Sequence, residues 1–364
     1  MALDVLVATR KGFVRLARKG KAWAQAPAAF VGSPVSAFLD DARDGRLYAA
    51  LRLGHFGVKL HRSEDGGATW TELPAPAFPA APAAAEPPAG GEKAPAVDMI
   101  WTLAAGGAPG ELWAGALPAG LFRSIDRGAS WSLVESLWNV PERKEWFGGG
   151  YDHAGIHSVH ADPRDPRRLT IAISSGGVWK SDDAGAAWRH VGKGLRAEYM
   201  PPARAYELNV QDPHRLAHCA AAPDVAWCQH HNGMFRSTDG GTTFEEIKGV
   251  KPSVFGFAVA AHPRDPLTAW FAPAVKDECR VPVDGKLVVT RTRDGGKSFE
   301  AFGDGLPAAG CFDLIYRHAL AVDGSGERLV MGSTTGNLWV SEDAGRSWMH
   351  VAGHLPPIAQ VAFA

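Results

Sequence analysis

The chain has 364 residues, and its 38 lysines and arginines nearly balance its 39 aspartates and glutamates, giving a formal net charge of −1. This balance excludes the general electrostatic attraction that draws basic proteins to nucleic acid or to anionic membranes. No stretch reaches the roughly 18 apolar residues of a membrane helix, and no charged leader precedes an apolar segment. We therefore expect a cytoplasmic protein whose four cysteines, none in a C-x-x-C pair, remain free thiols.

The first elements along the chain are two predicted strands, at residues 5–8 and 13–16, around a turn that contains Arg10. Gly20 and Trp23 follow at the spacing of a motif that recurs further along the chain, although Arg18 stands where that motif has an aspartate. We interpret residues 16–23 as a degenerate copy of the motif.

The motif itself is Ser/Thr-x-Asp-x-Gly-x-x-Trp/Phe, and it occurs six times between residues 63 and 348. Its aspartates are separated by 61, 57, 56, 55 and 49 residues. Repetition at about 40–50 residues or slightly more indicates a propeller or a solenoid. The six aspartates are Asp65, Asp126, Asp183, Asp239, Asp294 and Asp343.

The chemistry of the motif is that of a turn. An aspartate can accept hydrogen bonds from turn N–H groups, the glycine permits a backbone conformation that a Cβ would penalise, and the aromatic ring can pack between neighbouring sheets. The motif resembles the Asp-box, the BNR repeat of sialidases and related propellers. The resemblance implies a sialidase-like β-propeller in which these aspartates are structural and not catalytic.

One blade is clearest at residues 156–191, with strands A to D expected near 157–161, 169–173, 178–181 and 188–191. The degenerate copy supplies strands B, C and D without an A strand, whereas residues 357–364 resemble a lone strand A. We therefore predict that the C-terminal strand joins the N-terminal blade and closes the ring, which hides the sheet edges. The prediction is an all-β, seven-bladed propeller, with residues 1–364 forming a single domain.

The connections between strands divide between the two faces of such a ring. A–B and C–D turns lie on one face, and the B–C and D–A connections, which hold the long insertions, lie on the other. These insertions are expected at residues 74–96, 135–155, 192–214 and 273–286. Insertions and polar residues gathered on one face predict a ligand site at the channel mouth.

The candidate residues come from at least five blades. We predict catalytic roles for Asp277, Glu278, His318, Tyr151 and Asp152. We predict substrate binding by Arg10, His55, His153, His157, His231, Arg280 and Arg317. The expected ligand is small and anionic or sugar-like, since arginines pair well with carboxylates, and the expected oligomeric state is a monomer.

Three classes of function compete. The sialidase resemblance implies an arginine triad, a Tyr–Glu nucleophile and an Arg-Ile-Pro signature near the start, but Arg10-Lys11 lacks the proline and Arg280-Val-Pro282 lies in the wrong blade. True sialidase activity is therefore not expected. A hydrolase with two carboxylates, or a lyase with a His or Tyr base and an arginine facing a uronate, fits the candidates. Together these form the enzyme class.

The second class is metal chemistry. His153, His157 and His160, and the adjacent His230 and His231, match no established ligand spacing, so we assign no metal site and no cofactor and keep a divalent ion as an alternative. The third class is a non-catalytic scaffold for a protein or small-molecule partner, because Asp-box propellers also resemble a photosystem assembly factor and the luminal part of sorting receptors.

Overall fold

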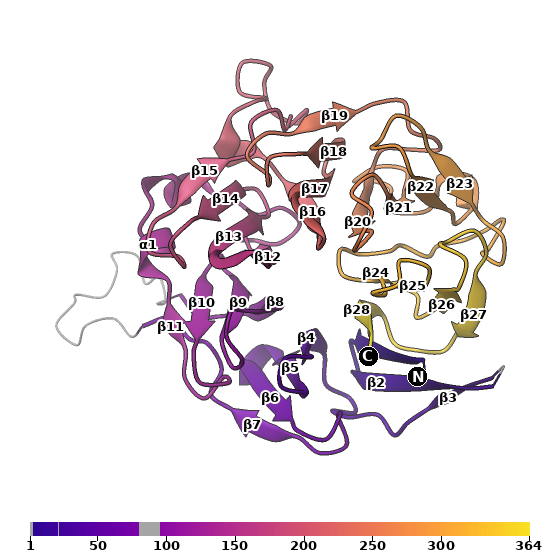
Figure 1. Cartoon of the computed structure of the whole chain (residues 1–364), viewed down its shortest axis with the longest axis horizontal. Helices are drawn as coiled ribbons and strands as arrows, with labels where there is room; N and C mark the ends of the chain where they lie inside the picture. The colour runs from indigo at the N-terminus through magenta and orange to yellow at the C-terminus, as the bar shows by residue number, and fades with distance from the viewer. Residues whose placement is uncertain (1–2, 21, 80–94) are drawn as a thin grey trace.

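A computed structural model describes residues 3–20, 22–79 and 95–364. It contains seven antiparallel sheets of four strands, arranged as blades around a central channel (Figure 1). The prediction of an all-β, seven-bladed propeller is confirmed. Within each blade we call the strands A to D from the channel to the rim. Of the insertion expected at residues 74–96, residues 80–94 lie outside the described residues.

The first four blades follow the chain from its N-terminus. Blade 1 consists of β28 (Ile358–Phe363), β1 (Asp4–Thr9), β2 (Gly12–Lys19) and β3 (Ala22–Gln25), and blade 2 of β4 (Val35–Asp41), β5 (Arg46–Arg52), β6 (Val58–Ser63) and β7 (Thr71–Leu73). Blade 3 consists of β8 (Met99–Ala105), β9 (Leu112–Leu117), β10 (Leu121–Ser124) and β11 (Ser132–Leu133), and blade 4 of β12 (Ile156–Asp162), β13 (Asp165–Ile173), β14 (Gly177–Ser181) and β15 (Arg189–Val191).

The remaining three blades complete the ring. Blade 5 consists of β16 (Pro213–Cys219), β17 (Ala222–His230), β18 (Gly233–Ser237) and β19 (Glu245–Ile247). Blade 6 consists of β20 (Gly256–Ala261), β21 (Ala269–Pro273), β22 (Val289–Thr292) and β23 (Glu300–Phe302), and blade 7 of β24 (Leu320–Val322), β25 (Leu329–Gly332), β26 (Leu338–Ser341) and β27 (Met349–Ala352). Short helices occur in the connections: η1 (Gly54–Phe56), α1 (Glu135–Trp138), η2 (Pro141–Glu145), η3 (Leu208–Val210) and η4 (Val283–Gly285). None of the described helices is long and apolar enough to cross a membrane.

The ring closes as predicted, with the C-terminal strand inside the N-terminal blade. β28 pairs antiparallel with β1, so that Val5 lies opposite Phe363 and Val7 opposite Val361. In Figure 1 the yellow β28 lies beside the indigo N-terminal strands, and both termini are found in the same blade. The amide of Gln360 also binds the backbone N–H and C=O of Phe38 in blade 2, which joins the closing strand to its neighbour.

The repeated motif forms the same C–D turn in six blades. In every copy the N–H four residues after the aspartate donates to its Oδ1 at 2.9 Å. The hydroxyl two residues before the aspartate accepts a bond from the motif glycine, as Ser181 does from Gly185 at 2.8 Å. That glycine has φ +87°, a left-handed conformation that a side chain would strain. The turn is therefore held by its own side chains.

Aromatic packing between blades supplies much of the core. The motif residue Trp70 packs edge-on against Phe13 of the neighbouring blade at 5.5 Å, so in this copy the motif ring lies between two sheets as expected. Five further tryptophans on the B and C strands are fully buried, at Trp113, Trp179, Trp227, Trp270 and Trp339. Because each blade buries apolar side chains against the next, the ring is stabilised as a whole.

The A strands share an irregularity that the sequence did not reveal. In six of the seven, the pairing with strand B shifts register near the start of strand A, so that an extra residue is accommodated there. Such a β-bulge turns the local side chain away from the regular alternation. The residues in these bulges are Ser36, Trp101, His157, His214, Phe257 with Ala258, and Ala359.

Candidate functional site

A cavity of about 1190 Å³ opens at the channel mouth, on the face that carries the B–C and D–A connections. Its wall combines three kinds of side chain. The cations are Arg10, Arg52, Lys276, Arg280 and Arg317; the acids are Glu198, Asp212, Asp277 and Glu278; and the aromatic residues are Trp101, Phe147, Tyr151, Tyr199, Phe255, Phe257 and Tyr316. We call this cavity the channel-mouth pocket.

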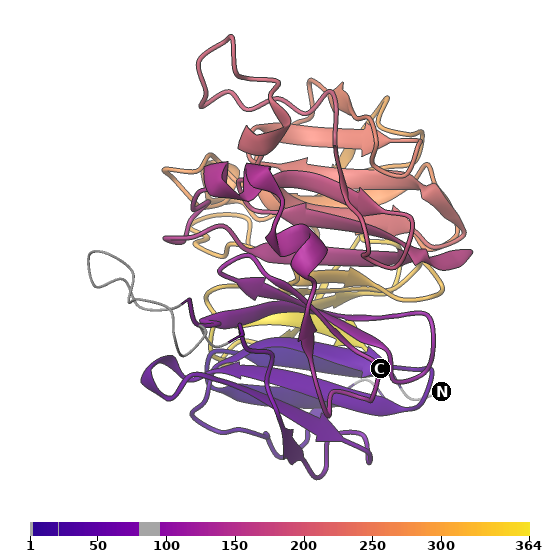
Figure 2. The same ribbon diagram turned by 90° about the vertical axis from the view of Figure 1, so that its left-hand side faces the viewer.

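The bulges of the A strands bring much of this wall into place. Five of the seven residues in these bulges line the pocket, namely Ser36, Trp101, His214, Phe257 and Ala359. These strands surround the channel in the ring view (Figure 1), and Figure 2 shows the same ring from the side. Strands from different blades therefore converge on one cavity, and a ligand in it would contact residues far apart in the sequence.

Arg317 is the most unusual cation of the pocket. Its side chain is buried, with 8% of the residue exposed, and within the described part of the chain it forms no ion pair or hydrogen bond. Its guanidinium carbon lies 4.8 Å from the ring centroid of Trp101 and 5.4 Å from that of Phe257. Burial lowers the pKa of this guanidinium, although Asp212 acts in the opposite direction. A buried charge without a direct partner is costly unless a ligand compensates it.

The B–C connection of blade 6 contributes a second arginine. Arg280 donates to Asp277 Oδ1 from both Nε and Nη2, at 3.0 and 2.6 Å, so this acid is already engaged. The guanidinium carbon of Arg280 lies 5.3 Å from the Phe257 ring, which Arg317 also contacts. Glu278, by contrast, is largely exposed and lies 3.6 Å from Lys276. The loop therefore presents a fixed Arg–Asp pair and a freer carboxylate to the pocket.

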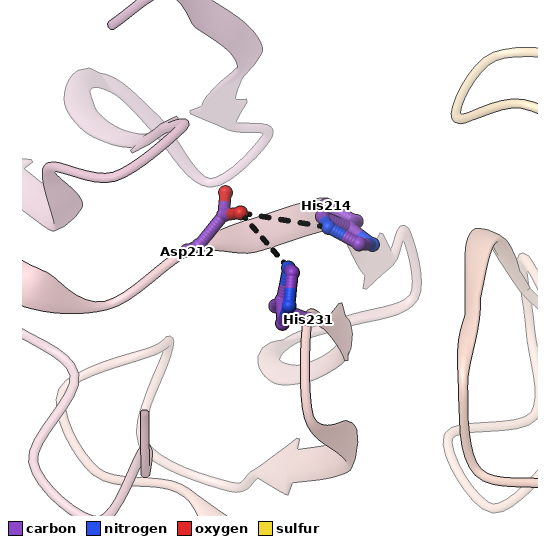
Figure 3. A group of neighbouring side chains, drawn as sticks. All are labelled: Asp212, His214 and His231. Carbon is purple, nitrogen blue, oxygen red and sulfur yellow. Dashed lines mark ion pairs between the residues drawn. The ribbon is translucent and has the colours of Figure 1, made fainter. Parts of the chain in front are cut away.

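Blade 5 places an aspartate between two histidines at the pocket wall (Figure 3). Oδ2 of Asp212 lies 3.5 Å from Nε2 of His214 and 3.4 Å from Nδ1 of His231. Asp212 and His214 are almost fully buried, whereas the side chain of His231 is 21% exposed. We call these three residues the Asp–His–His cluster.

The structure brings together eight of the twelve residues predicted for the site. Those at the pocket wall are Arg10, Tyr151, His231, Asp277, Glu278, Arg280, Arg317 and His318. Asp152, His153 and His55 are exposed and lie outside the wall, with His55 in η1. His157 is completely buried beneath the pocket, where burial holds its pKa well below the usual value. The roles assigned to all twelve stay predictions.

The sequence reasoning missed Asp212, His214, Trp101 and Phe257. Both Asp212 and His214 fall in the insertion expected at residues 192–214, but strand A of blade 5 already begins at Pro213. The expected bounds therefore placed these two residues in a loop instead of at the start of an inner strand. The Asp-Pro-His sequence at residues 212–214, directly before an apolar stretch, was the signal that could have identified them.

No known protein family matches the sequence, and no curated protein matches it either. Solved structures, however, are similar to the fold of this chain. The structure of a GH74 xyloglucanase from Xanthomonas campestris matches it with a TM-score of 0.63 and 19% sequence identity, over 96% of this chain and 52% of that one. The present chain thus spans about half the length of that enzyme.

Two further solved structures match the chain at more similar length. YCF48 bound to D1 peptide has a TM-score of 0.52 and 15% identity, over 87% of this chain and 82% of that one. A protein of unknown function from Desulfotomaculum acetoxidans has a TM-score of 0.58 and 12% identity, over 100% and 99% of the two chains. At such identities these similarities show the seven-bladed β-propeller fold alone.

Proposed function

We propose that this protein is an Asp-box propeller whose channel-mouth pocket binds a small anionic, sugar-like molecule. The six motif turns, with their common set of hydrogen bonds, support the assignment to that class of propeller. The four cysteines are unpaired, which fits the proposed cytoplasmic location.

The observation that carries the proposal is the buried guanidinium of Arg317. It faces the pocket from the D–A connection before β24, and no carboxylate among the described residues pairs with it. A ligand carboxylate would satisfy both its charge and its hydrogen-bond donors, and a guanidinium can hold a carboxylate by two parallel bonds. The surrounding low-dielectric wall would strengthen that attraction.

The aromatic walls beside Arg317 suit the rest of a sugar acid. Trp101 and Phe257 flank the guanidinium, and Tyr316 packs against Phe257 at 5.2 Å. Aromatic faces offer an apolar surface for the C–H groups of a sugar ring, whereas the rim supplies hydrogen-bonding groups for its hydroxyls. A neutral sugar would use the same walls but leave Arg317 uncompensated.

A lyase reaction is the catalytic form that one observation favours. Trp101 contacts both Tyr151, at 5.2 Å, and Arg317, at 4.8 Å, so a candidate base and the anion anchor flank one ring. In its deprotonated form, the Tyr151 oxygen would remove the proton beside the ligand carboxylate, and the electron pair would form a C=C bond as the C–O bond to the leaving sugar breaks. The oxygen of the leaving sugar would then take up that proton from the Tyr151 hydroxyl, which restores the base. A hydrolase would instead depend on Glu278, because Arg280 already engages Asp277.

The experiment compares glucuronate with glucose as calorimetric ligands of the wild type and of Arg317→Met. We expect the wild type to prefer glucuronate, and the variant to lose at least tenfold in affinity for it while its affinity for glucose is unchanged. Arg189→Met, which removes an exposed arginine on β15, is the matched control. Equal binding of both sugars by the wild type, or unchanged binding of glucuronate by Arg317→Met, would contradict the proposal.

Turnover is measured separately, with oligouronides as substrate. Unsaturated products detected by ultraviolet absorbance would support the lyase form, and new reducing ends without unsaturation would support a hydrolase. Binding of glucuronate without any turnover would support the non-catalytic alternative, in which the pocket only binds its partner.

A further inference from the structure

The Asp–His–His cluster has a geometry that ordinary hydrogen bonding does not explain. Both histidine nitrogens approach the same carboxylate oxygen, Asp212 Oδ2, at 3.5 and 3.4 Å (Figure 3). A charge-assisted N–H···O bond is shorter, about 2.7–2.9 Å. One ligand atom from each of the three residues lies within 4.8 Å of the others. The three groups therefore converge on a common point instead of bonding directly to one another.

The proton on His214 can be placed from its other contact. Nδ1 of His214 lies 2.7 Å from the carbonyl oxygen of Gly256, and a carbonyl can only accept, so Nδ1 carries the hydrogen. In the neutral tautomer that this bond fixes, Nε2 presents a lone pair towards Asp212 Oδ2. Two electron-rich atoms that face each other across 3.5 Å repel unless a cation lies between them.

The two separations from Asp212 Oδ2 match those between ligands of one metal ion, and the two histidine nitrogens lie within 4.8 Å of each other. Bonds of about 2.0–2.2 Å from Zn²⁺ to imidazole nitrogen or carboxylate oxygen, in a tetrahedral arrangement, put the ligand atoms about 3.4 Å apart. Two imidazoles and one carboxylate are also the donors that a catalytic zinc or similar ion takes from a protein, with a further position left open. We propose that Asp212, His214 and His231 bind one divalent first-row transition metal ion of the Zn²⁺ type.

Contacts behind the ligands hold them in place. The N–H of Ser175 donates to the second carboxylate oxygen, Oδ1 of Asp212, at 3.3 Å, which leaves Oδ2 for the ion. The His214 ring stacks on Phe257 at 4.3 Å with an interplanar angle of 11°, and the bond to Gly256 fixes its rotation. Partners of this kind orient metal ligands and raise affinity. The β-bulge therefore places the His214 side chain at the proposed metal site, and its contacts restrict its movement there.

The open side of the site faces the channel-mouth pocket, since all three residues line its wall. A divalent ion with one carboxylate and two neutral imidazoles carries a net charge of +1. It would add to the attraction of the pocket for an anionic oxygen. The metal site goes beyond the proposed function and does not depend on it, because the ion alone can be titrated.

The test uses the full chain after treatment with a chelator, titrated with Zn²⁺, Co²⁺ or Mg²⁺ by calorimetry. Visible absorption of the Co²⁺ form reports the coordination geometry. We expect one Zn²⁺ per chain, a Co²⁺ spectrum typical of four or five ligands, and no saturable binding of Mg²⁺, which prefers oxygen ligands. Absence of a saturable Zn²⁺ site in the wild type would overturn the proposal.

Variants then identify the ligands. His231→Ala and Asp212→Asn should each weaken Zn²⁺ binding at least tenfold and change the Co²⁺ spectrum. His354→Ala, which removes an exposed histidine in the D–A connection before β28, should bind as the wild type does. His231 is the least buried ligand, and His231→Gln is a second variant if the alanine form is unstable. Unchanged Zn²⁺ affinity in either folded His231 variant would also overturn the proposal, because the ion would then be bound elsewhere.

Discussion

Nε2 of His318 lies 2.8 Å from the carbonyl oxygen of His157, and this bond joins blade 7 to blade 4 across the channel. Because the carbonyl accepts, Nε2 carries the hydrogen, and burial holds the pKa of His318 well below its usual value. The two blades are separated by two blades on one side of the ring and three on the other. The bond therefore connects nearly opposite walls beneath the pocket.

We expect His318→Ala to destabilise the protein by about 1–3 kcal/mol, since the carbonyl of His157 would keep only the longer 3.5 Å bond from Nη1 of Arg215 inside the ring. Chemical denaturation measures the loss, with His153→Ala as an exposed control. If His318 is instead only a catalytic group, as the sequence predicted, the variant would lose turnover and keep the unfolding midpoint of the wild type.

The motif turn gives a second prediction. In Asp239→Ala, the N–H groups of Thr242 and Thr243 and the hydroxyls of Ser237 and Thr243 lose their bonds to the carboxylate. We expect a loss of about 1–2 kcal/mol, because the turn N–H groups can still bond to water. Thr238→Ala, at the neighbouring exposed position, should have little effect on the melting temperature. A melting temperature that stays the same in both variants would count against a structural role for the motif aspartate.

The closing strand gives a third prediction. A protein that lacks residues 358–364 would expose the ladder edge of β1 and lose the bonds of Gln360 to Phe38. We expect a lower melting temperature and concentration-dependent association, measured by calorimetry and light scattering. Removal of Ala364 alone is the control. Equal melting of the two truncated proteins would show that closure contributes little.

The fourth prediction concerns acid. The His190 ring stacks on Trp179 at 4.2 Å, and burial lowers the pKa of His190 to about 4. The unfolded chain has the ordinary value of about 6.5 and binds the proton first, so the stabilising effect is complete above pH 6.5 and is lost as the pH falls towards 4. His190→Phe should reduce the slope of unfolding free energy against pH in this window. His350→Phe, at the corresponding exposed position on β27, should keep the wild-type slope.

The fold could be predicted because its signals are local. A turn such as Ser181 to Trp188 needs a hydroxyl, a carboxylate and a glycine at fixed offsets, and these are visible in any single copy. The place of the C-terminal strand could be inferred by counting strands, because the N-terminal repeat lacked a strand A and the C-terminal segment had a strand without a blade. Neither inference required knowledge of contacts distant in the sequence.

The pocket could be predicted only in part, because bulges and strand starts decide which side chains enter it. The insertion that holds Arg280 was recognisable by its length and charge. In the sequence, however, Trp101 and Phe257 look like ordinary apolar residues of inner strands. Only the register shifts in the structure show that these two side chains depart from the regular alternation. Asp212 was missed because Pro213 was taken for part of a loop, although proline is acceptable at the first position of a strand.

Closure by β28 also determines when the N-terminal blade can be completed during synthesis. Val5 pairs with Phe363, so this blade stays one strand short until residues 358–363 have emerged from the ribosome. At about 5–20 residues per second, the other blades have tens of seconds in which to form while β1 has an unpaired edge. A nascent chain that stalls before residue 358 would leave that edge open to pairing with other chains.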